Sequence, residues 1–415
     1  MPIPEEGGAV SSALPAAEPS GGANQTRVRA YNERLVLSLV RRHGNQSKAE
    51  ITRRTGLSAQ TVSVIMRSLE KDGLLRRGAP VRGRVGQPST PLHLNPDAVF
   101  SFGLKIGRRS ADLVLMDFVG HIRKHRRRTY PFPLPRDIIA FLQSALSEIS
   151  AELTPAERGR IAGLGIAAPF ELWNWAEQVG APRGTMDAWR SFDLQAEVAA
   201  LVPYPVHLQN DATSACGAEL VFGAGPAYPD FIYFFVGSFI GGGIVLNSAL
   251  FVGRTGMAGS VGSLPVRNRN GETRQLLEIA SIFVLEDMLR ADNIDPQPLW
   301  YSADEWIDFG APLERWIQET AAALAQAILS AASIIDFSAA IIDGGFPAWV
   351  RQRLVAATIA AAGRMDLQGI PMPELREGTV GAQARAIGGA SLPIFARYLI
   401  DQNVLFKAVE AADAE

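Results

Sequence analysis

The first strong pattern along the chain is a set of apolar positions that recur with a helical period. The segment RVRAYNERLVLSLVRRHG ends at Gly44 and carries apolar residues three and four positions apart. These residues are Leu35, Val36, Leu39 and Val40. Residues at this spacing line one face of a helix, and glycine commonly ends one. The segment is therefore predicted to be an amphipathic helix.

Two shorter helices are predicted to follow, each opened by a serine. SKAEITRRTG has Ser47 as N-cap and Glu50 three residues later, which is the spacing of a capping box. SAQTVSVIMRSLEKDGLL starts at Ser58 and stops at Gly73. Its apolar face consists of Val62, Ile65, Met66 and Leu69. Two short helices joined by a tight turn, with a supporting helix before them, indicate a helix-turn-helix.

A basic, glycine-rich turn comes after the third predicted helix. The segment RRGAPVRGRVGQPSTPLHLNP reads as a strand, a basic tip and a return strand, which together make the wing of a winged helix. Arg82 and Arg84 stand at the tip, and the glycines beside them allow the backbone to lie close to a duplex. We expect this tip to reach the minor groove or the phosphates.

From Ala98 onward the pattern changes to alternating strands and helices. A hairpin or meander with a turn at Gly107 and Arg108 is predicted first, followed by a helix over RDIIAFLQSALSEIS and a buried strand over IAGLGIAAP. YPVHLQNDATSACGAELVFGAG reads as a strand and a helix, and FIYFFVGSFIGGGIVLNSALFVG reads as two strands around a glycine turn. A long alanine-rich helix, the strand AAIIDGG and a helix over VGAQARAIGGASLPIFARYL come last. This order predicts an α/β body of two similar lobes around a cleft.

Length and composition set bounds on this organisation. A chain of 415 residues is too long for one ordinary domain. We predict a disordered leader over 1–23, a winged helix-turn-helix over 24–95 and the two-lobed body over 96–415. The single cysteine, Cys216, excludes a disulfide framework and a cysteine-rich metal site. The leader lacks the basic start and apolar core of a signal peptide, and no stretch is apolar enough to span a bilayer, so a cytoplasmic protein is expected.

Charge is divided sharply between the predicted head and body. The formal net charge of the chain is −2, yet residues 24–95 hold 14 Lys and Arg against 4 Asp and Glu. Residues 96–415 carry a balance of −9 and the leader one of −3. A compact basic head on an acidic body indicates that the head meets a polyanion, and its helix-turn-helix pattern favours DNA.

The residues predicted to contact DNA lie on three segments of the head. Those expected to face the bases stand at the start of the third helix and are Ser58, Gln60, Thr61 and Ser63. Those expected to contact phosphates or the groove wall are Lys48, Arg67, Arg82 and Arg84. The alternative for the helix residues is an ordinary solvent-exposed face.

Six motifs of the body carry a resemblance to a known family. In chain order they are GLGIAAP, QNDATSACGAE, GGGIVLNSALFVGRTGMAGSVGS, LLEIAS, IIDGG and AIGGAS. With a winged helix before them, they make the chain similar to the repressor branch of the ROK family (repressors, open reading frames and kinases) over roughly residues 24–399. The resemblance implies an actin-like, sugar-kinase-type fold of two lobes. It also implies a sugar or sugar-phosphate effector, and a homodimer or homotetramer that binds double-stranded operator DNA.

Both phosphate loops depart from those of the family's kinases. In the first loop those kinases carry an aspartate and a Gly-Gly-Thr turn, whereas GLKIGRRSAD has Lys105 at the aspartate position and Arg108 and Arg109 after the glycine. An ammonium cannot organise magnesium as a carboxylate does, and bulky side chains keep the backbone away from phosphate. In the second loop Phe239 stands where the family usually has glycine. We therefore expect no phosphoryl transfer, no catalytic residue and no cofactor.

The expected ligand site is changed in part. The resemblance places Asp211 of QND at the family's catalytic base, and Asn210 and Asp211 are predicted to bind ligand hydroxyls. The alternative is an Asn-Asp helix cap, and the two roles are compatible. Trp189 of TMDAW resembles the family's sugar-contacting tryptophan, although Thr185 stands at the position of the accompanying asparagine.

The zinc pattern of the family is also changed. Ser260 and Ser263 of GSVGS occupy the positions of its glutamate and histidine, and we predict that they line the ligand site. The loop RNRNGETRQLLE contains neither Cys nor His and offers only Glu272 and Glu278, whereas zinc takes about four Cys, His or carboxylate ligands. We therefore expect no metal.

Two classes of function follow from these features. The first is a transcriptional regulator of sugar or carbohydrate-uptake genes, with a repressor favoured, whose kinase-like body senses a ligand without catalysis. The second is a sugar kinase with an appended DNA-binding head. Lys105 favours the first. The operator, the effector and the choice between repression and activation stay open at this point.

Overall fold

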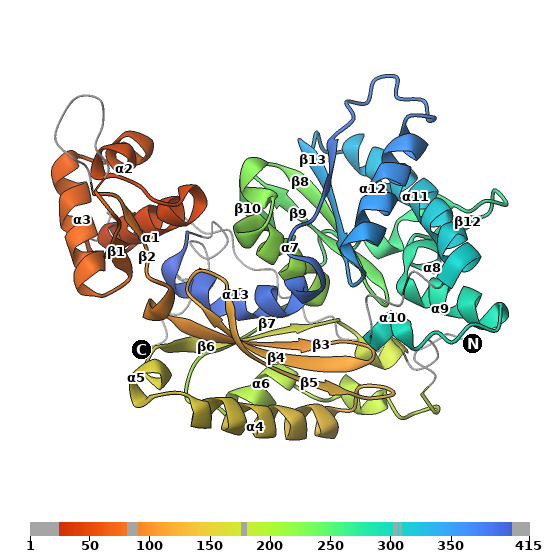
Figure 1. Ribbon diagram of the computed structural model, residues 1–415, viewed down its shortest axis with the longest axis horizontal. Helices are drawn as coiled ribbons and strands as arrows, with labels where there is room; N and C mark the ends of the chain where they lie inside the picture. The colour runs from red at the N-terminus through yellow and green to blue at the C-terminus, as the bar shows by residue number, and fades with distance from the viewer. Residues whose placement is uncertain (1–24, 81–89, 176–180, 302–305, 307–308, 401–415) are drawn as a thin grey trace, which may run out of the picture.

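The chain forms a small head beside two larger lobes, each built on its own β-sheet (Figure 1). The structure is a computed structural model that describes residues 25–80, 90–175, 181–301, 306 and 309–400. The predicted leader, 1–23, and the predicted wing tip with Arg82 and Arg84 lie outside the described residues. No helix in the described part of the chain has both the length and the apolar character that a membrane crossing requires.

Three helices and a two-stranded sheet form the head. Their bounds are α1 (Gln25–His43), α2 (Lys48–Thr55), α3 (Ala59–Lys71), β1 (Leu75–Arg77) and β2 (Leu92–Leu94). Ser47 and Glu50 form the predicted capping box, and the side chain of Ser58 caps α3. Gln46 pairs with Leu92, which ties the turn before α2 to the wing. The winged helix-turn-helix is therefore confirmed.

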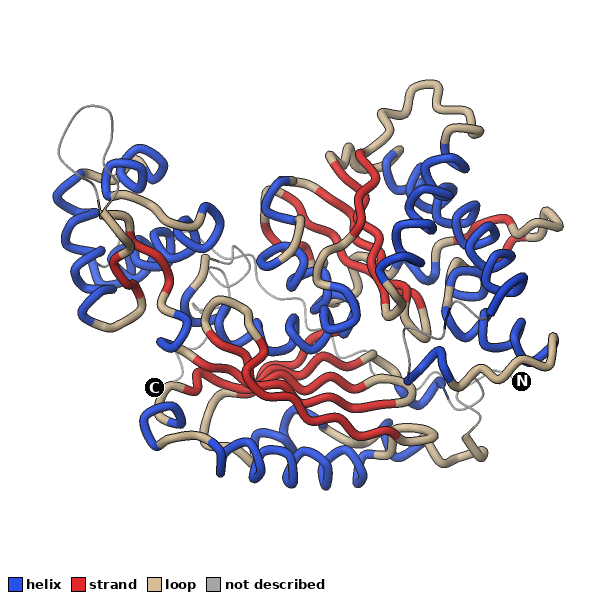
Figure 2. The backbone as a smooth tube through the Cα atoms, viewed as in Figure 1, coloured by secondary structure: helices blue, strands red, loops and turns tan. Residues whose placement is uncertain are grey.

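The first lobe is a mixed five-stranded sheet with helices on both faces. Its strands are β3 (Phe100–Ile106), β4 (Ser110–Asp117), β5 (Ile122–Thr129), β6 (Ile161–Ala168) and β7 (Val206–Asn210), in the order β5-β4-β3-β6-β7. β3 runs antiparallel to β4 and parallel to β6. One face packs on α4 (Pro135–Glu152) and α6 (Leu194–Ala199), and the other on α13 (Ala384–Tyr398), as Figure 2 shows.

The second lobe repeats this topology. Its strands are β8 (Phe231–Val236), β9 (Ile240–Leu246), β10 (Ala249–Phe251), β13 (Ala339–Gly344) and β14 (Glu374–Glu377), in the order β10-β9-β8-β13-β14. β8 is antiparallel to β9 and parallel to β13, just as β3 is to β4 and β6. The prediction of two similar α/β lobes is therefore confirmed.

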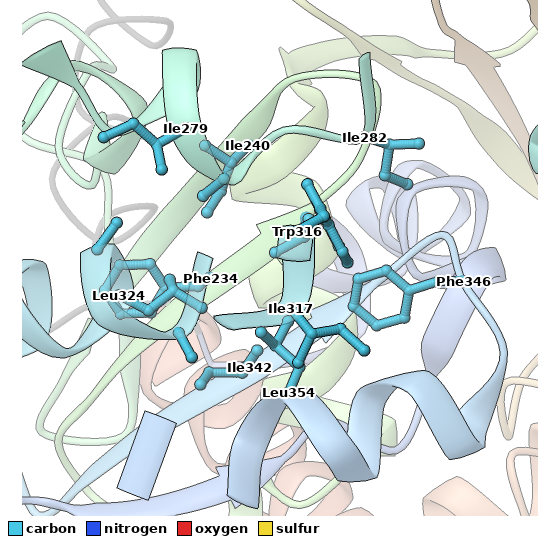
Figure 3. Close-up of a cluster of buried hydrophobic side chains, with 14 of the residues drawn as sticks. Phe234, Ile240, Ile279, Ile282, Trp316, Ile317, Leu324, Ile342, Phe346 and Leu354 are labelled. Carbon is cyan, nitrogen blue, oxygen red and sulfur yellow. The ribbon is translucent and has the colours of Figure 1, made fainter. Parts of the chain in front are cut away.

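A large hydrophobic cluster covers the outer face of the second sheet. It is formed with α9 (Ile282–Ala291), α11 (Gly310–Ala332) and α12 (Ala348–Ala362). In Figure 3, Phe234 and Ile342 of the sheet lie against Trp316, Ile317 and Leu324 of α11. Shorter helices and strands of the body are α5 (Pro155–Arg158), α8 (Leu277–Ala280), α10 (Pro298–Tyr301), β11 (Pro265–Arg267) and β12 (Thr273–Gln275).

Two helices, α7 (Asp211–Phe222) and α13, fill the space between the two sheets. α13 lies on β3 and β6, α7 lies on β9, and the helices pack against each other. Glycines permit this approach. A methyl group on Gly388 would overlap the carbonyl oxygen of Ser214, and one on Gly165 in β6 would overlap that of Gly389. The motifs AIGGAS and GLGIAAP therefore bring backbones together.

The head docks on the first lobe and on both of these helices. A continuous cluster of buried side chains runs from α1 and α3 to β4 and α13. The guanidinium of Arg41 in α1 lies between the rings of Phe118 and Phe222, 5.1 and 5.3 Å from their centroids, and donates to the carbonyl of Phe118. Burial lowers the pKa of Arg41 to about 10, against the opposing effect of Asp117, so Arg41 stays charged near neutral pH.

Replacing Gly388 with alanine is expected to destabilise the protein by roughly 1–3 kcal/mol, because overpacking a close contact has this effect. The added methyl group would push α13 away from α7 at Ser214. Urea unfolding measures the change. Gly217→Ala is the matched control, because a methyl group on Gly217 in α7 would meet Phe395 at an ordinary 3.5 Å. It should be neutral or slightly stabilising, since alanine favours a helix. Equal destabilisation by both variants would contradict the close-packing account.

Candidate functional site

The exposed face of α3 carries three residues in line. Gln60, Val64 and Arg67 are all exposed and follow one another at intervals of four and three positions, so they share one side of the helix. Arg67 also donates from Nε to the carbonyl of Ser63 at 3.1 Å. In helix-turn-helix proteins the second helix of the motif presents such a face to the major groove.

The hydroxyl groups predicted to face DNA are used within the helix. Ser58 accepts from the backbone N–H of Thr61 at 3.1 Å, and the two hydroxyl oxygens are 2.8 Å apart. Ser63 donates to the carbonyl of Ala59 at 2.8 Å. These residues therefore hold the first turn of α3, whereas Gln60 is exposed and takes no part in these hydrogen bonds. Lys48 is exposed at the start of α2.

Val64 was missed by the sequence analysis. Its side chain is 48% exposed, between Gln60 and Arg67 on the outward face of α3. The apolar spacing of the helix is satisfied by buried residues, so nothing in that pattern requires Val64 to be buried. An exposed aliphatic side chain in a major groove can contact the methyl group of thymine.

Four of the five predicted ligand residues line one pocket between the lobes. This pocket has a volume of about 240 Å³, and its walls include Asn210, Asp211, Ser260 and Ser263. Phe239 lines it too, and its ring lies 5.2 Å from that of Phe283. The side chain of Ser260 donates to the carbonyl of Met257 at 2.6 Å.

The two residues of the QND motif have distinct roles. Asn210 caps α7, because its Oδ1 accepts from the backbone N–H groups of Ala212 and Thr213 at 3.0 and 3.2 Å. Asp211 accepts from Nη1 of Arg385 at 3.1 Å, and both side chains are largely buried. Arg385 stands in the first turn of α13 and was not found by the sequence analysis, since a lone arginine there gives no motif.

Trp189, the fifth predicted ligand residue, does not line this pocket, and its contact with a ligand stays a prediction. It is 5% exposed within the core of the first lobe, and its indole N–H donates to the carbonyl of Pro133 at 3.0 Å. Its ring packs edge-on against Phe192. The likeness of TMDAW to a sugar-contacting segment does not determine which way the ring points. In this structure Trp189 therefore packs in the core of the first lobe.

The side chain of Lys105 fills the first loop. Its ammonium donates to the carbonyl and hydroxyl of Ser110 at 3.2 and 2.9 Å, and to Asp112 at 3.1 Å. Burial, together with the charge of Arg385, lowers the pKa of Lys105 to about 8, although Asp112 opposes this. Burial raises the pKa of Asp112, but the stronger effects of His125, Lys105 and Arg127 hold it well below its usual range.

The two arginines of the first loop connect the lobes. Arg108 and Arg109, in the turn between β3 and β4, pair with Glu286 of α9 at 3.2 and 3.0 Å. Glu286 is 1% exposed and also pairs with Arg290 on its own helix. The loop that approaches phosphate in a kinase here holds the cleft together through charge.

The segment RNRNGETRQLLE, which resembles the family's zinc loop in position, begins in β11 and includes β12, and these two strands form a hairpin. Glu272 accepts from the side chains of Asn268 and Arg274, and Glu278 accepts from the backbone N–H of Gln275. Among the described residues, no three His, Cys, Asp or Glu side chains cluster closely enough to hold a metal ion.

Two family models match separate parts of the chain. The ROK family model matches residues 101–277, which include nearly all of the first sheet, α7 and the lining of the ligand pocket except Arg385. The MarR family model matches residues 30–84, which span the helix-turn-helix.

Several proteins of known sequence resemble the chain over long segments. The protein y4fQ of Sinorhizobium fredii is 24% identical over 376 residues, covering 88% of this chain and 91% of its own. The xylose repressor of Bacillus subtilis is 26% identical over 244 residues, or 59% of this chain and 62% of the repressor. The match to this repressor thus spans less than two thirds of its length.

Solved structures support the fold. A ROK family transcriptional regulator, described as a homolog of the Escherichia coli MLC protein, superimposes with a TM-score of 0.64 at 19% identity, over 92% of this chain and 99% of its own. A ROK family glucokinase from Streptomyces griseus gives a TM-score of 0.56 at 22% identity, over 71% of this chain and 98% of its own. The regulator alignment therefore extends over more of this chain than the kinase alignment does. The chain is thus similar to the MarR family model over its head and to the ROK family model over much of its body, and the solved structures show the same fold.

Proposed function

We propose that this protein is a transcriptional repressor that binds operator DNA through its head and senses a sugar-like ligand in its body. The name of the Bacillus subtilis relative supports a repressor that responds to a sugar. The exposed face of α3 on a basic head supports DNA binding. The pocket around Asn210 and Asp211 supports recognition of hydroxyl groups, because an amide and a carboxylate are suited to that task.

One observation carries the link between ligand and DNA. α7 and α13 both begin at the ligand pocket, where Asp211 and Arg385 pair across their first turns. Both helices end at the head. Phe222 at the end of α7 stacks on Arg41, and Ile394 near the end of α13 shares the cluster of buried side chains with α1. The backbone N–H of Ile400, just beyond α13, also donates to Ser38 of α1 at 3.0 Å.

This arrangement gives a ligand a physical route to the head. A ligand hydroxyl that competes for Asp211 changes the pair that joins the first turns of the two helices. Because the backbones of the two helices are in direct contact, a displacement of one is passed to the other and on to the head. The head then has two positions relative to the body, one with and one without the displacement. The ligand changes the affinity for DNA only to the extent that it binds the protein in these two states with different affinities. We propose a homodimer or homotetramer, since two heads on a symmetric body read a pseudo-palindromic operator.

Phosphoryl transfer is not part of the proposal. The first loop holds a lysine and two arginines where a kinase needs a magnesium-binding carboxylate and an open backbone. Asp112 is nearby, but it is bound by Lys105 and by His125 at 2.9 Å. Asp211, the candidate base, is held in an ion pair with Arg385 at 3.1 Å.

Arg67→Ala and Gln60→Ala should weaken operator binding in different ways. Loss of one phosphate contact at Arg67 should lower the slope of log affinity against log salt by about one for any sequence. Gln60→Ala should change the preferred bases while leaving that slope intact. Fluorescence anisotropy over a salt series and in vitro selection measure these effects. Arg274→Ala, on the second lobe, is the control. The assignment of α3 fails if both head variants behave as Arg274→Ala does.

Arg41→Leu should loosen the head from the body. It removes a buried cation between two rings, an interaction worth about 0.5–2 kcal/mol. Amide hydrogen exchange in α1 should become faster by up to about thirtyfold, and operator affinity should fall. Arg42→Leu is the matched control, because the neighbouring Arg42 is exposed. If both variants leave the exchange of α1 unchanged, Arg41 does not hold the head in place.

No sugar-dependent ATP consumption is expected when the purified protein is mixed with magnesium-ATP and a panel of hexoses and pentoses. A coupled assay for ADP measures this, with a hexokinase as positive control. Sugar-dependent ADP formation that disappears in Asp211→Ala would establish the sugar kinase instead.

A further inference from the structure

A second cavity adjoins the ligand pocket. It has a volume of about 250 Å³ and lies where β3, β4 and β5 of the first lobe face α10 and the first turn of α13. It shares Arg108, Ser238 and Arg385 with the ligand pocket. The two cavities are therefore adjacent, and each is below the range of about 300–1,000 Å³ that is usual for drug-sized ligands.

The walls of this second cavity are strongly basic. Five cationic side chains line it against one carboxylate, Asp112. The cations are Lys105, Arg108, Arg109, Arg127 and Arg385. Among the described residues, Glu286 and Asp211 lie outside the lining and form ion pairs with these cations, so the five cations outnumber these three carboxylates. A concentration of like charge at low solvent exposure attracts an anion strongly.

Donors without acceptors give a second, independent indication. Among the described residues, Nε of Arg109, Nε of Arg385 and the indole N–H of Trp300 are buried and have no hydrogen-bond partner. All three side chains line this cavity. Buried donors are normally satisfied, so an excess of donors around one space indicates a missing acceptor. The lowered pKa of Lys105 is consistent with this, because burial and Arg385 both disfavour its charge and a bound anion would restore it.

We propose that this cavity binds the anionic group of the effector, which is thereby a polyhydroxy compound bearing a phosphate or a carboxylate. The anion sits among Lys105, Arg109, Arg127 and Arg385, and the hydroxyl groups reach Asn210 and Asp211 in the adjoining pocket. The inference rests on the proposed function in one respect, because the ligand is an effector only if the protein regulates transcription. The anion site itself does not depend on DNA binding.

The site differs from one that holds a nucleotide with magnesium. A magnesium ion requires free oxygen ligands, and the lining carboxylate Asp112 is already bound by Lys105 and His125. Arginine and lysine side chains suit a phosphate or carboxylate held without metal.

Titration of the DNA-free protein with inorganic phosphate in a calorimeter tests the site. Gln383 lines the cavity at the N-cap of α13, so Gln383→Glu places a negative charge there while keeping all five cations. A carboxylate at a helix N-terminus is favourable, so the variant should fold. Saturable binding is expected for the natural protein, weakened at least about tenfold in Gln383→Glu by charge repulsion. Lys105→Met, which removes one cation, should weaken binding as well.

Gln143→Glu is the matched control, because Gln143 is exposed on α4, away from the cavity. It should bind phosphate as the natural protein does. Thermal melting shows whether each variant is folded. If Gln383→Glu does not fold, the phosphate affinity of Lys105→Met decides the test. The absence of saturable binding, or equal binding by the folded variants and the natural protein, would overturn the anion site.

Competition experiments identify the source of the anion. Glucose 6-phosphate and gluconate are each added to the phosphate-bound protein, with glucose as the neutral reference. Displacement by the first alone indicates a phosphate ester, and displacement by the second indicates a carboxylate. If neither displaces phosphate better than glucose does, the assignment to an anionic polyhydroxy compound fails. Operator binding by Gln383→Glu, measured in parallel, separates failure of the anion site from failure of the DNA-binding head.

Discussion

The contact between α7 and α13 is the constraint on which the other features depend. α13 packs on the first sheet and α7 mainly on the second, and their backbones meet at Gly388 and Ser214 without intervening side chains. This contact fixes the distance between the lobes, and so the width of the ligand pocket. It also fixes where the two helices end, and therefore where the head is held. A single packing relation thus sets the geometry of both ends of the molecule.

Ion pairs, rather than apolar contacts, join the two lobes across the cleft. Glu286 is almost completely buried, and three arginines around it supply the compensation that such a carboxylate requires. Buried pairs of this kind contribute little net stability when they are compared with apolar packing, but breaking one is costly. The cleft therefore favours particular arrangements of its lobes. A charged ligand entering beside these pairs redistributes interactions that already exist, which is a more selective effect than filling an empty apolar space.

Local features of the head could be predicted from the sequence because short-range rules determine them. The capping box of Ser47 and Glu50 and the cap at Ser58 involve residues three positions apart. In the body, alternating strands and the glycine motifs predicted the two lobes. α12 was not predicted, since its alanine-rich sequence spreads apolar residues around the helix rather than along one face. The pairing of Arg108 with Glu286 joins residues 178 positions apart, and the sequence shows the charges but not their partners. The burial of Trp189 in the first lobe likewise depends on tertiary packing that the motif TMDAW does not show.

The return of α13 to the first lobe has a consequence for how the protein is made. The first lobe begins at Phe100, yet one face of its sheet is covered by a helix that starts at Ala384. During synthesis on the ribosome, that face and the surface that receives α1 stay incomplete until nearly the whole chain has emerged. The helix-turn-helix is translated before the body, but the surface of the body that it packs against is completed only when α13 is in place. A truncated product thus carries a head without the contacts that orient it, and exposes an apolar sheet face of the kind that promotes aggregation.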